Sequence, residues 1–278
     1  MPKTFTDTEK LAALRLIRSE NVGPVTYHQL TSFFNNPSAA LEALPSLAKR
    51  GGRRKPIKIY SKQAAEKEIA ALVKLDGQLL VHGESAYPLA LSVINDAPPV
   101  LSILGHIHLL KRPMVAIVGA RNASVAGLKM TEKLAAGLGE RDFLIVSGMA
   151  RGIDASAHEH ALPYGTAAIL AGGIDNIYPA ENEDLYLRIK EEGVLMAENP
   201  LGVKPLARHF PRRNRIIAGL SLGVIVTEAA LRSGSLITAR LAGEQGREVM
   251  AVPGSPLDPR CRGANYLIKN GAALIENV

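Results

Sequence analysis

Arginine and glycine stand together in a turn that directly follows an apolar run, and this combination suits anion binding. The run MVAIV is followed by Gly119-Ala120-Arg121-Asn122-Ala123-Ser124. In the dinucleotide pattern G-x-G-x-x-G, the second and third glycines would fall at Arg121 and Ser124, so a cofactor pyrophosphate would meet a side chain. A guanidinium beside a helix N-terminus instead grips an external phosphate through paired hydrogen bonds. Gly119 and Arg121 are therefore candidate ligand contacts.

Two later turns carry similar residues. The run FLIVS leads into a turn that contains Ser147, Gly148 and Arg151, where amides freed by glycine make a second anion cradle. The run TAAIL leads into a stretch from Gly172 to Asn182 that is too long for a plain connection, which favours a functional loop. Tyr178 in this loop is a candidate for stacking on a base.

The strongest charge signal lies between Asn199 and Thr227, where the sequence contains no acid. Its cations and their neighbours include the candidate ligand contacts Arg208, Phe210, Arg212, Arg213, Asn214 and Arg215. Pro211 suits the first turn of a helix that carries the last three arginines. Unbalanced cations on one short element favour an anionic partner. The structural alternative is that one arginine pairs with Glu228 or Asp154 inside the fold.

The elements that position these turns read as alternating strands and helices from Met114 onward. The predicted strands are MVAIV, FLIVS, TAAIL, GVLMA, LGVIVT, EVMAV and AALIE, preceded by QLLVHG and an extended passage from Tyr87 to Leu101. Continuous apolar runs are typical of strands buried on both faces, as in a parallel sheet between two helix layers. Ligands bind beyond the carboxyl ends of such strands, so the turns described above converge on one crevice.

Residues 1–76 read differently, as a helical domain with a basic linker, while residues 77–278 form the predicted α/β domain. Three short helices are expected between Thr8 and Leu47, and the turn Asn21-Val22-Gly23-Pro24 resembles a helix-hairpin-helix. Any tight turn between helices also favours Gly-Pro, so this resemblance leaves a purely structural turn open. The run from Lys49 to Pro56 is basic and lacks apolar periodicity, which predicts a solvated loop.

The overall composition limits the class of protein. Thirty-three Lys and Arg against 26 acids give a net charge of +7, which attracts polyanions only where it is concentrated. The N-terminus lacks an apolar signal core, and no apolar run has the length of a membrane span. The one cysteine, Cys261, excludes an intrachain disulfide. These features predict a cytoplasmic protein without a membrane segment.

Several of these motifs in this order resemble the DprA family, the DNA-processing proteins of natural transformation. The resemblance rests on the helical N-terminus, Tyr87-Pro88, Ala97-Pro98-Pro99-Val100-Leu101, Gly119-Ala120-Arg121, Ser147 to Asp154, Tyr178-Pro179-Ala180-Glu181-Asn182 and Phe210 to Arg215. It implies an α/β fold with an extended Rossmann-like, doubly wound, mostly parallel sheet, preceded by a small all-helical domain of sterile-alpha-motif-like or helix-hairpin-helix-like type.

The resemblance also implies a function. Members bind single-stranded DNA, form homodimers and help load RecA, and neither a cofactor nor a metal nor catalysis is implied. Family DNA contacts map onto Arg121 and onto the loop from Tyr178 to Asn182. Relatives often have lysine where this chain has Ala180, so Arg208 or Arg212 would have to supply the missing charge. Many relatives continue into a winged-helix domain, whereas this sequence stops at Val278.

A nucleotide or nucleoside-phosphate hydrolase is the alternative function. Glu228 beside the Ser233-Gly234-Ser235 turn is a candidate general base. Against this alternative, the sequence has no triphosphate-binding loop and no zinc-ligand spacing. The two histidines of His158-Glu159-His160 point to different faces of a helix, and both are expected at the surface. The apolar residues Leu236, Ile237, Leu267 and Ile268 fit either a core or a dimer interface.

Overall fold

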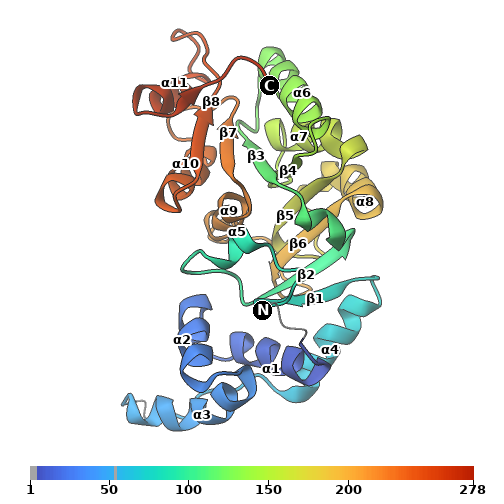
Figure 1. The fold of residues 1–278 in the computed structure, drawn as a ribbon, viewed down its shortest axis with the longest axis vertical. Helices are drawn as coiled ribbons and strands as arrows, with labels where there is room; N and C mark the ends of the chain where they lie inside the picture. Colours follow the sequence, from blue (N-terminus) through green and yellow to red (C-terminus); the bar gives the residue numbers. More distant parts are fainter. Residues whose placement is uncertain (1–4, 53–54) are drawn as a thin grey trace.

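The computed structural model describes residues 5–52 and 55–278, in which a helical domain is followed by one large sheet with helices on both faces (Figure 1). The helical domain consists of α1 (Asp7–Arg18), α2 (Pro24–Phe34), α3 (Pro37–Arg50) and α4 (Lys62–Val73). The rest consists of β1 (Gln78–Val81), α5 (Leu89–Ser92), β2 (Val100–Gly105), β3 (Met114–Val118), α6 (Val125–Gly139), β4 (Leu144–Ser147), α7 (Ile153–Ala161), β5 (Thr166–Gly173), α8 (Glu183–Glu192), β6 (Val194–Asn199), α9 (His209–Leu220), β7 (Gly223–Val226), α10 (Ser235–Glu244), β8 (Glu248–Ala251), α11 (Arg262–Lys269) and β9 (Ala273–Leu274). Short 3₁₀ turns lie at η1 (Ile107–Lys111), η2 (Leu162–Tyr164) and η3 (Ala180–Asn182).

Local sequence signals set the limits of the N-terminal helices. The Thr6 side chain and Glu9 form a reciprocal capping box at the start of α1, and Pro24 and Pro37 begin the next two helices. Helix α3 continues through Arg50, so the predicted basic loop starts later than expected. Its central residues, Arg53 and Arg54, lie outside the described residues.

The sheet confirms the predicted architecture, with strand order β1-β2-β6-β5-β4-β3-β7-β8-β9. Strand β2 is antiparallel to both of its neighbours, and all other neighbouring strands are parallel. All seven strands predicted from Met114 onward are present. The sequence analysis missed β2, because it treated Val100 and Leu101 only as the end of an extended passage.

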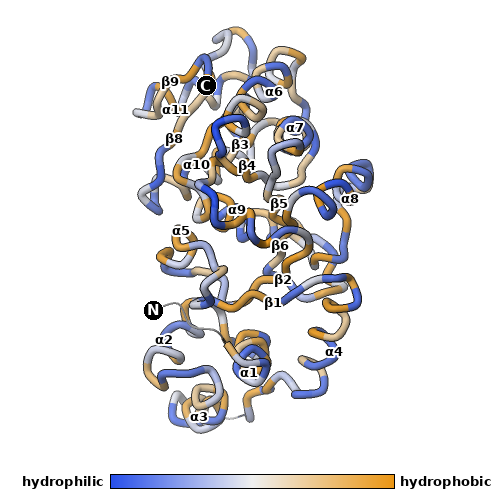
Figure 2. Tube along the Cα trace, turned by 45° about the vertical axis from the view of Figure 1, so that its right-hand side comes forward, coloured by the Kyte–Doolittle hydropathy of each residue, from blue (hydrophilic) through white to orange (hydrophobic). Residues whose placement is uncertain are grey.

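Helices cover the sheet in two layers. Helices α6, α7 and α8 pack on one face, and α5, α9 and α10 pack on the other. Figure 2 shows apolar strands running between these layers. A third cluster of buried side chains continues from the helical domain, through Leu14 and Leu72, to Leu104 of β2 and Ile189 of α8. The helical domain therefore packs on the sheet through a shared core. The division at residues 76 and 77 stays a prediction.

The strand order places a switch point at β3. From β3 the chain moves to β4 on one side, and it later returns to β7 on the other side. In an open α/β sheet, the loops that leave such neighbouring strands diverge and leave a crevice at their carboxyl ends. The segments after β3, β4 and β7 therefore surround the position where a ligand is expected.

Candidate nucleic-acid interface

Two adjoining hollows, together called the crevice below, lie at this switch point. The larger has a volume of about 580 Å³ and lies between the turn after β3, the start of α9 and the start of α10. The smaller, of about 520 Å³, lies between the turns after β3 and β4 and the loop that carries Tyr178. Both hollows are lined by Arg121, Asn122, Ala150 and Phe210. The predicted convergence of the turns is thus present in the structure.

An arginine and two aromatic rings form the centre of the crevice. The guanidinium carbon of Arg121 lies 5.4 Å from the ring centroid of Phe210, and the Tyr178 ring lies 5.7 Å from Phe210 on an edge-to-face geometry. Tyr178 is 48% exposed, and Arg121 is exposed as well. Within residues 5–52 and 55–278 no carboxylate forms an ion pair with Arg121. A cation and two rings are thus available to a ligand together.

The turn after β4 is mostly committed to the fold. The Ser147 hydroxyl is buried and donates to the Ile117 carbonyl at 2.6 Å. A Cβ atom at Gly148 would lie 2.6 Å from the guanidinium of Arg213, so the glycine is required for this close packing. Of the predicted contacts in this turn, only Arg151 presents an exposed side chain, and it forms an ion pair with Glu181.

Asn182 is buried, although the sequence analysis placed it among the ligand contacts. Its amide nitrogen donates to the Met149 carbonyl at 2.9 Å and to the Ala150 carbonyl at 3.4 Å. These bonds fasten the loop that carries Tyr178 to the turn after β4. Asn182 therefore positions the loop, and its amide nitrogen is already engaged.

The acid-free cluster divides into exposed and buried side chains. Arg208 and Arg212 are exposed, whereas Arg213 is buried and donates to the carbonyls of Gly148 and Ile169. Burial lowers the pKa of the Arg213 guanidinium to about 10, with Asp154 raising it and Arg121 lowering it. The guanidinium therefore stays charged at pH 7. Arg213 is therefore held by the fold through backbone carbonyls; its charge acts on nearby Asp154, but no ion pair between the two is found among the described residues.

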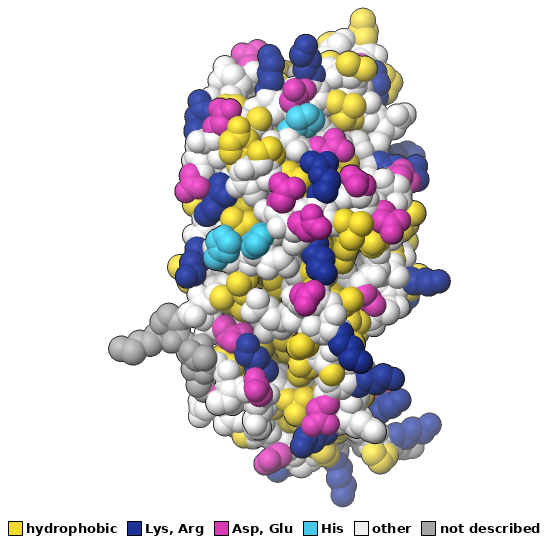
Figure 3. Space-filling view, turned by 90° about the vertical axis from the view of Figure 1, so that its right-hand side faces the viewer, with side chains coloured by type: hydrophobic (Ala, Val, Ile, Leu, Met, Phe, Trp, Pro, Cys, Tyr) yellow, Lys and Arg dark blue, Asp and Glu magenta, His cyan; other side chains and the backbone are white. Residues whose placement is uncertain are grey.

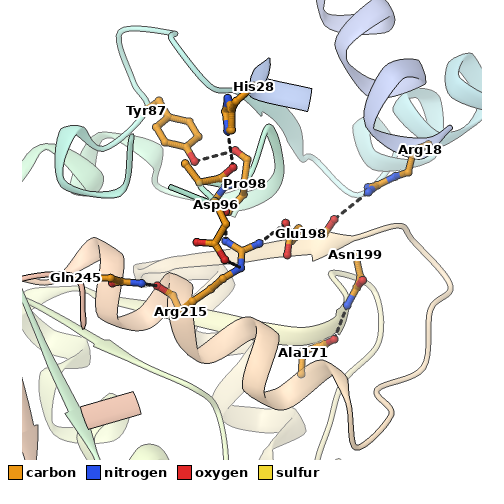
Figure 4. Close-up of polar contacts among 11 residues, drawn as sticks. Arg18, His28, Tyr87, Asp96, Pro98, Ala171, Glu198, Asn199, Arg215 and Gln245 are labelled. Carbon is orange, nitrogen blue, oxygen red and sulfur yellow. Dashed lines mark hydrogen bonds and ion pairs between the residues drawn. The ribbon is translucent and has the colours of Figure 1, made fainter. Parts of the chain in front are cut away.

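Arg215 lies away from the crevice, in the joint between the helical domain and the sheet, which corrects its predicted place in the crevice (Figure 4). Its Nε atom lies 3.2 Å from an Asp96 carboxylate oxygen, and its Nη2 atom lies 2.5 Å from Glu198 Oε1. Arg18 of α1 donates to the Glu198 carbonyl at 3.1 Å. Two distant carboxylates, which sequence spacing does not reveal, hold Arg215 in the interior.

Asn214 is also buried, but one side of it lines the larger hollow. Its side-chain oxygen accepts from Arg213 Nε at 3.2 Å, and its amide nitrogen donates to the Gly234 carbonyl at 3.4 Å. The sequence analysis overlooked Arg232 and Arg260, which line the same hollow. Both lie beyond strand ends, in the segments after β7 and β8, so the rule that identified Arg121 would have found them.

Glu228 occupies the N-terminus of α6. It is buried, and its carboxylate accepts from the Ser124 amide at 3.0 Å and from the Ser124 hydroxyl. A helix N-terminus at this turn is where a dinucleotide pyrophosphate binds in other proteins. The carboxylate fills that position here. Its bonds also give Glu228 a capping role, which argues against the general-base role considered for it.

The predicted surface position of the histidine cluster is wrong for His158. This side chain is fully buried, and its Nδ1 atom lies 2.8 Å from the Thr166 hydroxyl. Burial, and to a smaller extent the charge of nearby Arg213, lower the pKa of His158 to about 3. In the part of the chain that the structure describes, no group of three or more potential metal ligands is found, and no helix is long and apolar enough to cross a membrane.

On one face of the molecule, positive and negative charges are mixed (Figure 3). Figure 3 shows the face covered by α7 and α8, where Lys and Arg side chains alternate with Asp and Glu over the upper part. Such alternation favours neither sign of ligand.

A helical domain followed by a mostly parallel sheet with a switch-point crevice defines a two-part protein with a Rossmann-like unit. Residues 78–278 match the family described as DNA recombination-mediator protein A, and residues 7–71 match the DprA-like N-terminal HHH domain. The chain therefore belongs to the DprA/Smf family of recombination mediators.

Individual relatives agree with this assignment. The chain is 48% identical over 194 residues to the DNA processing protein DprA of Streptococcus pneumoniae, covering 69% of this chain and 68% of that protein. It is 42% identical over 219 residues to the protein Smf of Escherichia coli, covering 78% of this chain and 59% of that protein. The chain thus spans only about three fifths of the Escherichia coli relative.

Solved structures give the same result. The X-ray structure of Streptococcus pneumoniae DprA matches 100% of this chain and 96% of that chain, with a TM-score of 0.76 and 36% identity. DNA processing protein A of Helicobacter pylori matches 72% of this chain and 91% of that chain, with a TM-score of 0.67 and 32% identity. That protein is described as having a unique single-stranded DNA binding mode.

Proposed function

We propose that this protein binds single-stranded DNA in the crevice. The observation that carries the proposal is the exposed guanidinium of Arg121, which lies over Phe210 without a carboxylate partner among the described residues. A strand of DNA offers phosphates for the guanidinium and bases for the rings of Phe210 and Tyr178. The binding described for the Helicobacter pylori relative supports this assignment.

The chemistry of the crevice favours single strands with weak sequence preference. Bases of a single strand are free to stack on aromatic side chains, and every base has such a face. Phosphate contacts supply affinity without reading sequence, and they make binding fall steeply as salt rises. Ala180 provides no cation in the loop, so Arg208 and Arg212 at the start of α9 are the proposed substitutes.

The proposal includes a role in recombination without catalysis. By family resemblance, the bound strand is handed to RecA, and the expected compartment is the cytoplasm. Glu228, the acid considered for hydrolysis, is engaged in capping α6, which supports a binding role.

A homodimer is proposed to form through the surface of α10, β8 and α11. A hollow of about 590 Å³ lies there, lined by Leu236, Val249, Leu267 and Ala272 among others, and Tyr266 at its edge is 54% exposed. Apolar side chains in a hollow edged by an aromatic residue suit a protein interface.

The test is a salt-dependent titration of labelled oligothymidine and of a matched duplex. Arg121→Ala is expected to weaken single-strand binding about tenfold and to reduce the salt slope by about one, because one phosphate contact is lost. Arg141→Ala is the matched control, since this exposed arginine just beyond the C-terminal end of α6 donates to the Gly137 carbonyl and lines neither the crevice nor the proposed dimer surface. Preference for the duplex, or equal behaviour of the two variants, would overturn the proposal.

A further inference from the structure

At the edge of the crevice, the exposed side chain of Arg151 forms an ion pair with Glu181. Arg151 Nη2 donates to Glu181 Oε2 at 2.9 Å, and Arg151 Nε contacts Glu181 Oε1. The side chains are 61% and 49% exposed. Arg151 also lines the smaller hollow, beside Tyr178. The guanidinium that is best placed to extend the phosphate contacts of Arg121 is thus occupied by a carboxylate.

The chain holds this carboxylate in place. Glu181 lies in the short turn η3, and the next residue, Asn182, donates to the carbonyls of Met149 and Ala150, which directly precede Arg151. The loop of Glu181 and the turn of Arg151 are therefore fastened together by buried hydrogen bonds. Because an exposed ion pair contributes little to stability, the pair itself is not required for this attachment.

A guanidinium uses the same two parallel donors for a carboxylate as for a phosphate. On the basis of the proposed function, we propose that Glu181 occupies the phosphate-binding position of Arg151 until a DNA phosphate displaces it. Glu181 thereby sets the affinity of the crevice for single strands. A strand that enters the smaller hollow must displace Glu181, so part of its phosphate binding energy is used in breaking the pair. Ligands without a phosphate at that position leave the pair closed.

Comparison with Glu228 shows why exchange is assigned to Glu181. Glu228 is 3% exposed, is bonded to Ser124 at the start of α6, and has no route to solvent without loss of that cap. Glu181 is bonded only to an exposed side chain in the described residues, and both partners already contact water. The first carboxylate closes an anion site permanently, and the second closes one reversibly.

The opposite end of the crevice contains a similar pair. Arg260, which lines the larger hollow, donates from Nη2 to Asp258 Oδ2 at 2.8 Å and from Nε to Asp258 Oδ1 at 3.1 Å. Hydrogen bonds from Arg260 lower the pKa of the Asp258 carboxyl. Asp258 also accepts from the Arg260 backbone amide, so it supports its own turn. Glu181 is therefore the cleaner position for a test.

The experiment measures oligothymidine binding as a function of salt for Glu181→Gln. We expect affinity to rise about 3- to 10-fold and the salt slope to become steeper by about one, because Arg151 is freed for a phosphate. Glu66→Gln is the matched control, since it removes the same charge from an exposed ion pair with Lys62 on α4. Thermal unfolding of both variants checks that the fold is retained.

A second variant separates local exchange from a general change in charge. The double variant Glu181→Gln/Arg151→Gln is expected to bind oligothymidine no more tightly than Arg151→Gln alone, because it has no Arg151 guanidinium to be freed. A gain that persists there, or Glu181→Gln binding no better than Glu66→Gln, would overturn the inference. If Arg121→Ala still weakens binding in that case, the proposed function stands. If wild type shows no single-strand binding dependent on Arg121, the proposed function itself fails.

Discussion

Arginines play opposite parts in the crevice and in the joint between the helical domain and the sheet. In the crevice, Arg121 is exposed and lies over an aromatic ring, and Arg151 has an exposed partner. In the joint, Arg18 pairs with Glu68, and Arg215 lies between Asp96 and Glu198 (Figure 4). The same side chain therefore serves a ligand or the fold according to its burial and to the number of partners that the fold supplies.

Helix α9 shows this difference within one turn and a half. Phe210 at its start lines the crevice, Arg212 is exposed, and Arg215 follows only a few residues later in the interior. A buried charge is tolerated only where hydrogen bonds and opposite charges replace water. Arg213 and Arg215 have such partners. The predictions below test whether this division is as sharp as the contacts indicate.

The largest expected effect is on stability, at Arg215. Arg215→Ala leaves Glu198 and Asp96 without their cation, so the free energy of unfolding should fall by about 3 kcal/mol. Arg212→Ala, an exposed position in the same helix, should change it by less than about 0.5 kcal/mol. Urea denaturation of both variants measures the difference. Equal effects would contradict the division of α9 into a buried and an exposed part.

A smaller effect is expected from acid, at His158 of α7, which is buried near Arg213 of α9. The folded protein keeps His158 neutral, with its pKa lowered to about 3, whereas the unfolded chain protonates near the ordinary value. Above about pH 6.5 both states are neutral at this position, so the free energy of unfolding does not depend on this group. Between about pH 6.5 and pH 3 only the unfolded chain binds the proton, so the free energy of unfolding falls by about 1.4 kcal/mol for each pH unit.

Urea denaturation of wild type and His158→Gln between pH 7 and pH 5 measures this loss. The variant has no group to protonate at that position, so its unfolding free energy should depend less on pH. If the two pH profiles run parallel, His158 does not contribute to the pH dependence of the unfolding free energy, which would contradict its neutral state in the folded protein.

The smallest effect is expected at Phe210, an aromatic residue that lines the crevice. Phe210→Ala should weaken oligothymidine binding by about 1–2 kcal/mol through loss of base stacking. Because no charge is removed, the salt slope should stay the same, unlike that of Arg121→Ala. An altered slope would indicate that Phe210 acts by holding Arg121 in place and not by stacking.

Sequence alone predicted the fold well because its signals are local. Buried parallel strands appear as apolar runs, and the turn after β3 reveals Arg121 by its position in that turn. The exposure of Arg212 and the burial of Arg215 could not be separated from the sequence. Asp96 is 119 residues away from Arg215, and Glu198 lies on strand β6, which only the fold places against α9. Strand β2 was missed for a similar reason, because its antiparallel pairing with β1 and β6 is set by tertiary contacts.

The most direct test of the central claim is photo-crosslinking of an oligonucleotide that carries 5-bromodeoxyuridine, with the modified peptides identified by mass spectrometry. If the strand crosses the exposed side of α9, the crosslinks should fall on the peptides that contain Phe210 and Tyr178, and Arg121→Ala should reduce them. Crosslinks confined to the helical domain, with none on those two peptides, would contradict the account.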